Sequence, residues 1–161
     1  MKVVVRLLIF AAVIFGTQEA KAQAYCEYLF GFAWCDASWS VDDITIGTFS
    51  AQNTGCGTGG PYTNNTATTI SVTKGSPTAF TLGSGSAAVM WGIWIDLNHD
   101  GDFTDATDFF WGSNSASTTV SGSFVVPAGT VPANTRIRIA SRNQSLAIAK
   151  ADACDFGFMA E

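Results

Sequence analysis

Four oxygen-bearing side chains occupy alternate positions of one short stretch and surround a single glycine, Gly101. They are Asp96, Asn98, Asp100 and Asp102, and two more aspartates follow at positions 105 and 108. Ca²⁺ takes about 6–8 oxygen ligands, and side chains on alternate residues can turn their oxygens toward one centre when the backbone curls. The glycine permits such a tight turn. We therefore predict a Ca²⁺ site made of Asp96, Asn98, Asp100, Asp102 and Asp108.

This loop is not a standard EF-hand. With Asp96 as the first position, the twelfth is Thr107 instead of glutamate, and a carboxylate comes only at Asp108. The residues that follow alternate like a strand and lack helical spacing. We therefore expect the loop to connect two strands. The competing interpretation is an ordinary soluble turn rich in Asp, Asn and Gly.

The strand before the loop, residues 87–95, is the most hydrophobic part of the chain after its first 24 residues. It places Val89, Trp91, Ile93 and Ile95 on one face, and Met90 and Trp94 on the other. We expect a central strand that is buried on at least one face.

Several other short segments have strand composition and are separated by Gly, Pro, Asn and Ser. They are residues 43–49, 66–73, 78–82, 109–111, 118–126 and 135–141. With no helical pattern among them, they predict a single antiparallel β-sandwich of jelly-roll or Ig-like type. In the last segment we expect a half-exposed strand on which Arg136 and Arg138 meet nearby carboxylates.

Residues 1–24 have the pattern of a secretory signal peptide. Lys2 and Arg6 precede an apolar run over residues 7–15, and small residues in A-x-A order follow at 20–24. That run is shorter than the roughly 20 residues of a membrane helix. We expect a secreted or cell-surface protein whose mature domain, residues 25–161, does not insert into a membrane. This part holds 5 basic and 12 acidic side chains, a balance that argues against nucleic-acid binding.

All four cysteines, at positions 26, 35, 56 and 154, lie after the signal peptide. An even number of cysteines in an exported chain predicts two disulfides. Three connectivities are open. We favour Cys35–Cys56 with Cys26–Cys154, because the second bond would tie the first strand of the domain to the last.

Carbohydrate binding is the alternative function, because exposed aromatic rings bind sugar faces and the chain has 5 tryptophans, 12 phenylalanines and 3 tyrosines. The candidate residues are Trp34, Trp39 and Trp111. Paired carboxylates between positions 96 and 108 would also suit a fragment of a glycoside hydrolase, but cation binding competes for the same groups. A catalytic triad would have to be built around the single histidine, His99. We therefore expect no enzyme activity.

Motifs spread over residues 25–161 are similar to those of one known family. They are Tyr25–Cys26, the strand at 44–46, the loop from Gly55 to Tyr62, the sequence IWIDLNHDGDF at 93–103, VVPA at 125–128 and TRIRI at 135–139. In these motifs the chain resembles the GEVED domain of secreted and cell-surface bacterial proteins. The resemblance implies a monomeric accessory or adhesion module whose partner is a glycan or a surface protein. It marks the same five residues as cation ligands and supplies no catalytic residue.

The resemblance ends at the C-terminus. The family closes with Gly-Glu-Val-Glu-Asp-Tyr after a cysteine, whereas here only Gly157 and Glu161 match that motif. Either the motif is degenerate or the chain is truncated. We favour truncation, because a sandwich without its last strand would expose an edge.

Overall fold

The computed structural model describes residues 25, 35–56, 62–142, 148, 153–154 and 158–160. The expected signal peptide, Cys26 and Trp34 lie outside these residues. The described residues form nine strands and contain no α-helix. The strands are β1 Val41–Ile46, β2 Phe49–Ala51, β3 Tyr62–Thr63, β4 Pro77–Ser84, β5 Met90–Ile95, β6 Phe109–Gly112, β7 Thr119–Val125, β8 Ile137–Arg142 and β9 Phe158–Ala160.

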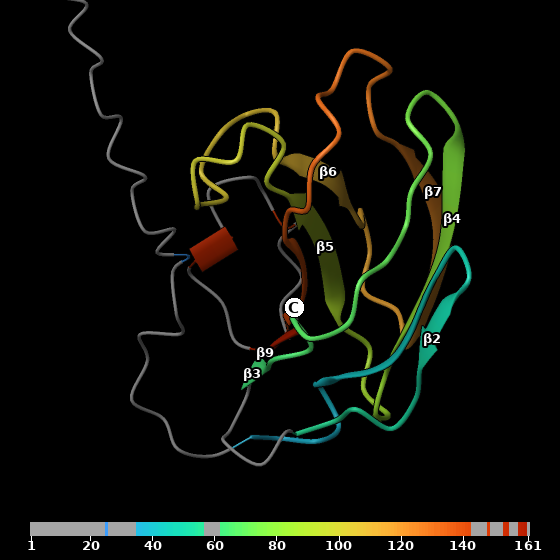
Figure 1. Ribbon diagram of the computed structural model, residues 1–161. Coiled ribbons are helices and arrows are strands. Elements are labelled where there is room, and N and C mark those ends of the chain that lie inside the picture. The colour runs from blue at the N-terminus through green and yellow to red at the C-terminus, as the bar shows by residue number, and fades with distance from the viewer. Residues whose placement is uncertain are drawn as a thin grey trace, which may run out of the picture.

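These strands make two sheets that pack face to face (Figure 1). One sheet has the order β2-β1-β4-β7, and the other has the order β3-β9-β8-β5-β6. Every pairing is antiparallel except β3 with β9, which is parallel. The predicted all-β sandwich is confirmed.

Apolar side chains gather in two layers. The inner core lies between the sheets and contains Val41, Ile44, Ile46, Phe80, Leu82, Val89, Trp91, Ile93, Ile95, Phe124, Val126 and Ile139. A second group, the outer cluster, consists of Tyr25, Met90, Trp94, Phe103, Ala140, Ile148 and Ala153. Residues of β5 alternate between the two groups, so the predicted division of this strand into two apolar faces is confirmed.

The segment expected as one strand at residues 43–49 is instead a hairpin. β1 ends at Ile46, which pairs with Phe49 at the start of β2, so a two-residue turn of Gly47 and Thr48 joins them. Gly47 has a φ of 56°, in the left-handed region that glycine adopts without a Cβ clash. The tight turn that this glycine allows reverses the chain, and the one-strand prediction was wrong.

The prediction of a strand at residues 66–73 was also wrong. This segment contains β-branched residues at nearly every position, yet it forms a turn and then irregular structure. It lines the gap between the two sheets, where Ile70 packs against the inner core while most of its threonines stay exposed. Strand propensity largely measures packing on a sheet, and here the side chains pack without backbone pairing.

A disulfide joins Cys35 to Cys56, with the two Cα atoms 5.7 Å apart. It links the residues before β1 to those after β2, as predicted. Closing a loop of this length stabilises a fold by about 3 kcal/mol in the chain-entropy model. Cys154 is also disulfide-bonded. In the described part of the chain no helix has the length and apolar character needed to cross a membrane.

Candidate functional site

The acidic loop, residues 96–108, connects the neighbouring antiparallel strands β5 and β6 (Figure 1). Trp94 pairs with Phe109 across the two strands, and the Ile95 amide donates a hydrogen bond to the Asp108 carbonyl at 2.8 Å. The two ends of the loop are therefore held together by the sheet. The prediction that this loop joins two strands is confirmed.

Two carboxylates lie at the base of the loop, and both are fully buried. Asp96 and Asp108 have 0 % exposure. Asp96 Oδ1 accepts from the His99 amide at 2.7 Å, and Asp96 Oδ2 accepts from the Gly101 amide at 3.2 Å. Asp108 accepts weaker bonds, each 3.3 Å long, from the amides of Leu97 and Asp105. Four backbone amides of the loop thus donate to these two buried carboxylates.

The rest of the loop curls through successive turns in which a side-chain oxygen accepts the amide two residues ahead. Asn98 accepts from Asp100 at 3.3 Å, and Asp100 accepts from Asp102 at 3.1 Å. Asp102 accepts both the amide and the hydroxyl of Thr104 at 2.8 Å. The residues between them adopt left-handed backbone, with φ of 60° at His99 and 92° at Gly101. Alternation of Asp and Asn with left-handed residues therefore produces the curl.

The Asn98 amide group connects two exposed parts of the loop. Its Nδ2 donates to Asp100 Oδ2 at 2.7 Å and to Asp105 Oδ2 at 2.5 Å. A positively polarised NH₂ group thus lies between two carboxylates. Rotation of this amide by 180° would present its oxygen at the same place, at little steric cost.

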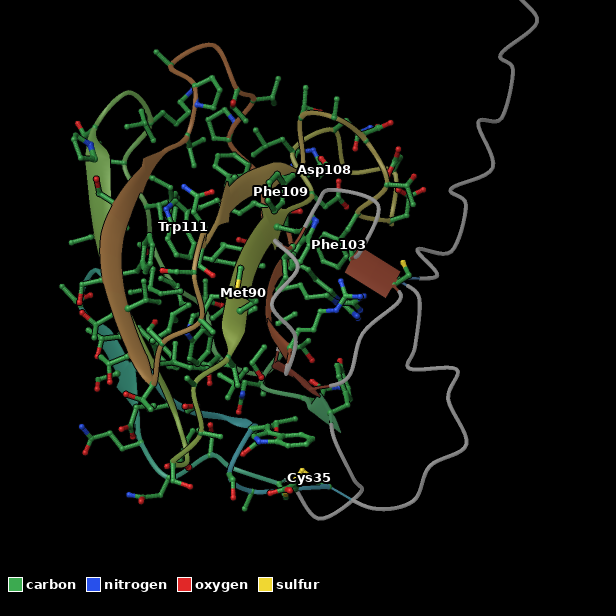
Figure 2. All side chains as sticks on the ribbon, turned by 180° about the vertical axis from the view of Figure 1, so that it is seen from behind. Cys35, Met90, Phe103, Asp108, Phe109 and Trp111 are labelled. Atoms are coloured by element: carbon green, nitrogen blue, oxygen red, sulfur yellow. A yellow bond between two sulfur atoms is a disulfide. The ribbon has the colours of Figure 1, made fainter. Side chains whose placement is uncertain are left out.

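An aromatic side chain anchors the loop to the domain. Phe103 is fully buried in the outer cluster, where its ring centroid lies 5.0 Å from that of Tyr25. The guanidinium of Arg138 lies over the Phe103 ring, 4.7 Å from its centroid, and donates a hydrogen bond to the Ala153 carbonyl at 2.7 Å. Figure 2 shows Phe103 and Asp108 at the same end of the sandwich, away from Cys35.

The contacts of Arg138 correct one expectation from the sequence. This residue was expected on a half-exposed strand face, where it would meet carboxylates, but it has 1 % exposure. The outer cluster covers that face of β8, which the two-residue alternation of Arg and Ile alone does not reveal. Arg136 is half-buried, with its guanidinium 4.3 Å from the Tyr25 centroid.

The electrostatics of the loop differ between its base and its exposed part. Burial raises the pKa of Asp108, and the nearby charges of Asp96 and Asp105 raise it further. Hydrogen bonds from the Thr104 amide and hydroxyl lower the pKa of Asp102. Burial raises the pKa of Tyr25 above its ordinary value, and its hydrogen bond to Asp96 acts in the same direction. The ionised form is therefore disfavoured at Asp108 and favoured at Asp102.

The structure brings the predicted ligands together only in part. Asp96 and Asp108 share the base, while Asn98 and Asp100 lie together in the exposed part. Asp102 is turned toward Thr104, and Asp105, which was not among the predicted ligands, contacts Asn98 instead. Among the described residues, no three acidic, histidine or cysteine side chains already form a group that could hold a metal ion.

Two of the three tryptophans that were candidates for sugar binding, Trp39 and Trp111, pack against the domain. Trp39 and Trp111 are half-buried and contact the inner core. The Trp111 ring centroid lies 5.0 Å from that of Phe80 in an edge-on arrangement. The large hydrophobic side chains that the described residues expose are Val72, Val125 and Val131, none of which is aromatic.

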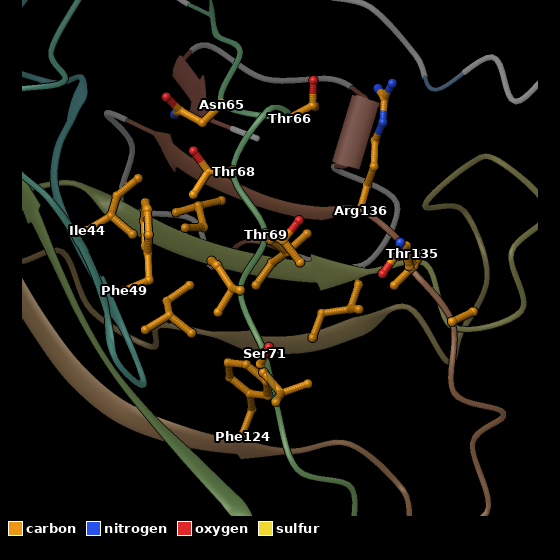
Figure 3. A pocket seen from close by; sticks show the side chains of 18 of the residues that line it. Ile44, Phe49, Asn65, Thr66, Thr68, Thr69, Ser71, Phe124, Thr135 and Arg136 are labelled. Atoms are coloured by element: carbon orange, nitrogen blue, oxygen red, sulfur yellow. The ribbon is translucent and has the colours of Figure 1, made fainter.

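A cavity of about 650 Å³ opens between the two sheets beneath residues 65–72 (Figure 3). Isoleucines of the inner core line its depth, and threonines and asparagines line its rim. Thr135, Arg136 and Tyr25 also line it, so the cavity adjoins the residues behind the acidic loop. No tryptophan is among its lining residues, and it therefore does not provide the aromatic platform expected for a sugar.

Comparison with known proteins gives one family. The family model described as the GEVED domain matches residues 90–161. The match starts at the first residue of β5 and includes the acidic loop. It is narrower than the resemblance seen in the sequence, which began at Tyr25. No curated protein and no solved structure gives a significant match.

Proposed function

Residues 90–161 belong to the GEVED domain family, and from this premise we propose that the protein is a secreted, non-catalytic accessory module that binds Ca²⁺ through its acidic loop. The observation that carries the calcium proposal is the burial of two carboxylates, Asp96 and Asp108, at the base of one loop. Buried anions are costly unless a positive group compensates them. The raised pKa of Asp108 reflects that cost.

Export is supported by two features. Residues 1–24 have the composition of a signal peptide, and the Cys35–Cys56 disulfide is of a kind that persists in oxidising compartments. A glycan or a surface protein is the partner that we propose for such a module. Its monomeric state is part of the same proposal.

The donors in the acidic loop fit a hard cation better than a transition metal. They are carboxylate, amide and carbonyl oxygens, which are the ligands that Ca²⁺ prefers. The Asn98 NH₂ group, held between Asp100 and Asp105, stands where positive charge is favoured. Asn98 and Asp100 are exposed, so their side chains can rotate toward an ion at little cost.

We assign the ligands as the side chains of Asp96, Asn98, Asp100, Asp105 and Asp108. Asp102 would contribute its backbone carbonyl, as the seventh position of an EF-hand loop does, because its side chain is held by Thr104. A bound Ca²⁺ would supply positive charge among these carboxylates. Its effect is to stabilise the β5–β6 hairpin, and no catalytic step is involved.

Thermal unfolding of the secreted, oxidised protein tests this proposal. A ligand that binds only the folded state at 100 times its Kd adds about 2.7 kcal/mol, which corresponds to a midpoint rise of roughly 10 °C for a domain of this size. We expect that rise on going from excess EGTA to millimolar Ca²⁺. Mg²⁺ should give a much smaller rise, because it requires octahedral geometry and keeps its water.

The control is Asp100→Ala, which removes an exposed carboxylate and leaves both apolar layers unchanged. We expect this variant to match the wild-type midpoint in EGTA and to lose most of the calcium-dependent rise. Equal midpoints of the wild type in EGTA and in Ca²⁺ would reduce the acidic loop to a solvated turn.

A further inference from the structure

Tyr25 contacts the acidic loop from far away in the sequence. Its hydroxyl donates a hydrogen bond to Asp96 Oδ2 at 2.6 Å, across 71 residues. Tyr25 has 6 % exposure and lies outside the nine strands. A side chain near the start of the expected mature domain thus reaches a carboxylate that we assign as a ligand.

The ring of Tyr25 is fixed independently of its hydroxyl. One contact is with the buried Phe103, at 5.0 Å between centroids. The Arg136 guanidinium lies 4.3 Å from the Tyr25 centroid, within the range of a cation–π interaction. Phe103 from the loop and Arg136 beside β8 therefore hold the Tyr25 ring so that its hydroxyl reaches Asp96.

Asp96 is held by donors from two sources. Amides of the loop itself, at His99 and Gly101, bind its two carboxylate oxygens. Tyr25 binds the carboxylate, and the Thr135 hydroxyl binds the Asp96 backbone carbonyl. Contacts from outside the loop therefore fix both the side chain and the backbone of this residue. In metal sites, such partners orient the ligating groups and raise affinity.

We infer that Tyr25 is a positioning residue of the cation loop, and that ion binding and the docking of Tyr25 onto the loop strengthen each other. This inference rests on the proposed calcium function. An oriented Asp96 binds the ion more tightly than a mobile one, because less side-chain freedom is lost on binding. By thermodynamic linkage, an ion that favours the docked position of Asp96 also favours the docking of Tyr25.

The test is calcium affinity of the secreted, oxidised Tyr25→Phe variant, measured by calorimetric titration after removal of Ca²⁺ with EGTA. Phenylalanine keeps the ring contacts with Phe103 and Arg136 and removes only the hydroxyl. Loss of a partner that orients a ligand lowers metal affinity by about 10–100-fold, and we expect a loss in this range. Affinity of the folded protein is not altered by a loss of stability alone, so a purely structural role would leave it unchanged.

Tyr62→Phe is the matched control. It also removes one tyrosine hydroxyl, but Tyr62 lies in β3 and not in the acidic loop. It should bind Ca²⁺ like the wild type. If the wild type binds and Tyr25→Phe binds equally well, the role of Tyr25 is overturned while the calcium proposal stands. If the wild type itself shows no binding, the calcium proposal fails and the role of Tyr25 fails with it.

Hydrogen exchange tests the coupling from the other direction. In the wild type, Ca²⁺ should slow amide exchange both in residues 96–108 and in the peptide that contains Tyr25. In Tyr25→Phe, saturating Ca²⁺ should protect the loop and protect the N-terminal peptide much less. Protection of the N-terminal peptide that is the same in both proteins would show that its docking does not depend on the Tyr25–Asp96 contact.

Discussion

The outward faces of the two sheets differ in what covers them. In the four-stranded sheet, β4 alternates between buried and exposed residues, and the exposed Thr81 and Ser121 hydrogen-bond to each other at 2.9 Å. In the five-stranded sheet, all six residues of β5 are buried. The outer cluster covers this second outward face, with Met90, Trp94 and Ala140 contributed by β5 and β8.

Because the outer cluster covers β5, the acidic loop begins at the end of a strand that is packed on both faces. β5 is packed on both faces, and an ideal Cβ at Gly92 would come within 2.4 Å of the Trp94 ring, so the strand is tightly confined. Functional groups are held most accurately by rigid elements. The four-stranded sheet, solvated on one side, offers a less confined base. The outer cluster thus acts as the support of the candidate site, because Phe103 and Tyr25 belong to both.

The largest expected effect tests whether the outer cluster is structural. Trp94→Ala should lower the free energy of unfolding by about 3–5 kcal/mol, because it removes a fully buried ring and leaves a cavity. Thr81→Ala, on the corresponding face of the other sheet, should change it by no more than about 0.5 kcal/mol. Urea unfolding of the oxidised proteins measures both. Similar small losses in the two variants would mean that the two outward faces are energetically alike.

Much of this architecture could be predicted from residue patterns. Apolar alternation gave the two faces of β5, and the spacing of oxygen-bearing residues located the loop between two strands. Both signals are local, since they depend on neighbours in the chain. The pairing of Cys35 with Cys56 was also predicted, as one of three open connectivities.

The errors come from contacts between distant residues. The threonine-rich segment at 66–73 looked like a strand because propensity does not report whether a partner strand is available. Arg138 looked half-exposed because nothing near it in the sequence indicates the outer cluster. Tyr25 was noticed only as part of a motif, and its contact with Asp96 spans 71 residues. Asp105 has a carboxylate that could bind a cation, but it was not among the predicted ligands because it falls outside the alternate positions 96, 98, 100 and 102.

The second prediction concerns Asp108, the buried carboxylate at the end of the acidic loop beside β5. Asp108→Asn should unfold at a higher temperature than the wild type in EGTA at neutral pH, and it should lose the calcium-dependent rise of roughly 10 °C. The reason is that the raised pKa makes the ionised Asp108 unfavourable in the folded protein. A lower midpoint than the wild type in EGTA would contradict this account.

The sign of the pH dependence follows from the same shift. A carboxyl with a raised folded pKa binds its proton more tightly in the folded state, so its contribution to stability falls as pH rises from the ordinary aspartate value through the raised one. The midpoint advantage of Asp108→Asn in EGTA should therefore grow as pH rises from about 4. Protons also compete with the ion, so wild-type calcium affinity should fall as pH is lowered through the same window.

The smallest expected effect separates two aspartates of the acidic loop, Asp102 and Asp105, that are only partly buried. Asp105→Asn should weaken calcium binding about tenfold, because it removes a carboxylate that Asn98 holds toward Asp100. Asp102→Asn should change it by less than about threefold, because an asparagine oxygen can still accept from Thr104 and the backbone carbonyl stays in place. Calorimetric titration distinguishes the two. If Asp102→Asn lowers calcium affinity as much as Asp105→Asn does, the carboxylate of Asp102 must turn away from Thr104 and bind the ion. The loop would then use the side chain of every alternate residue from Asp96 to Asp102 as a ligand.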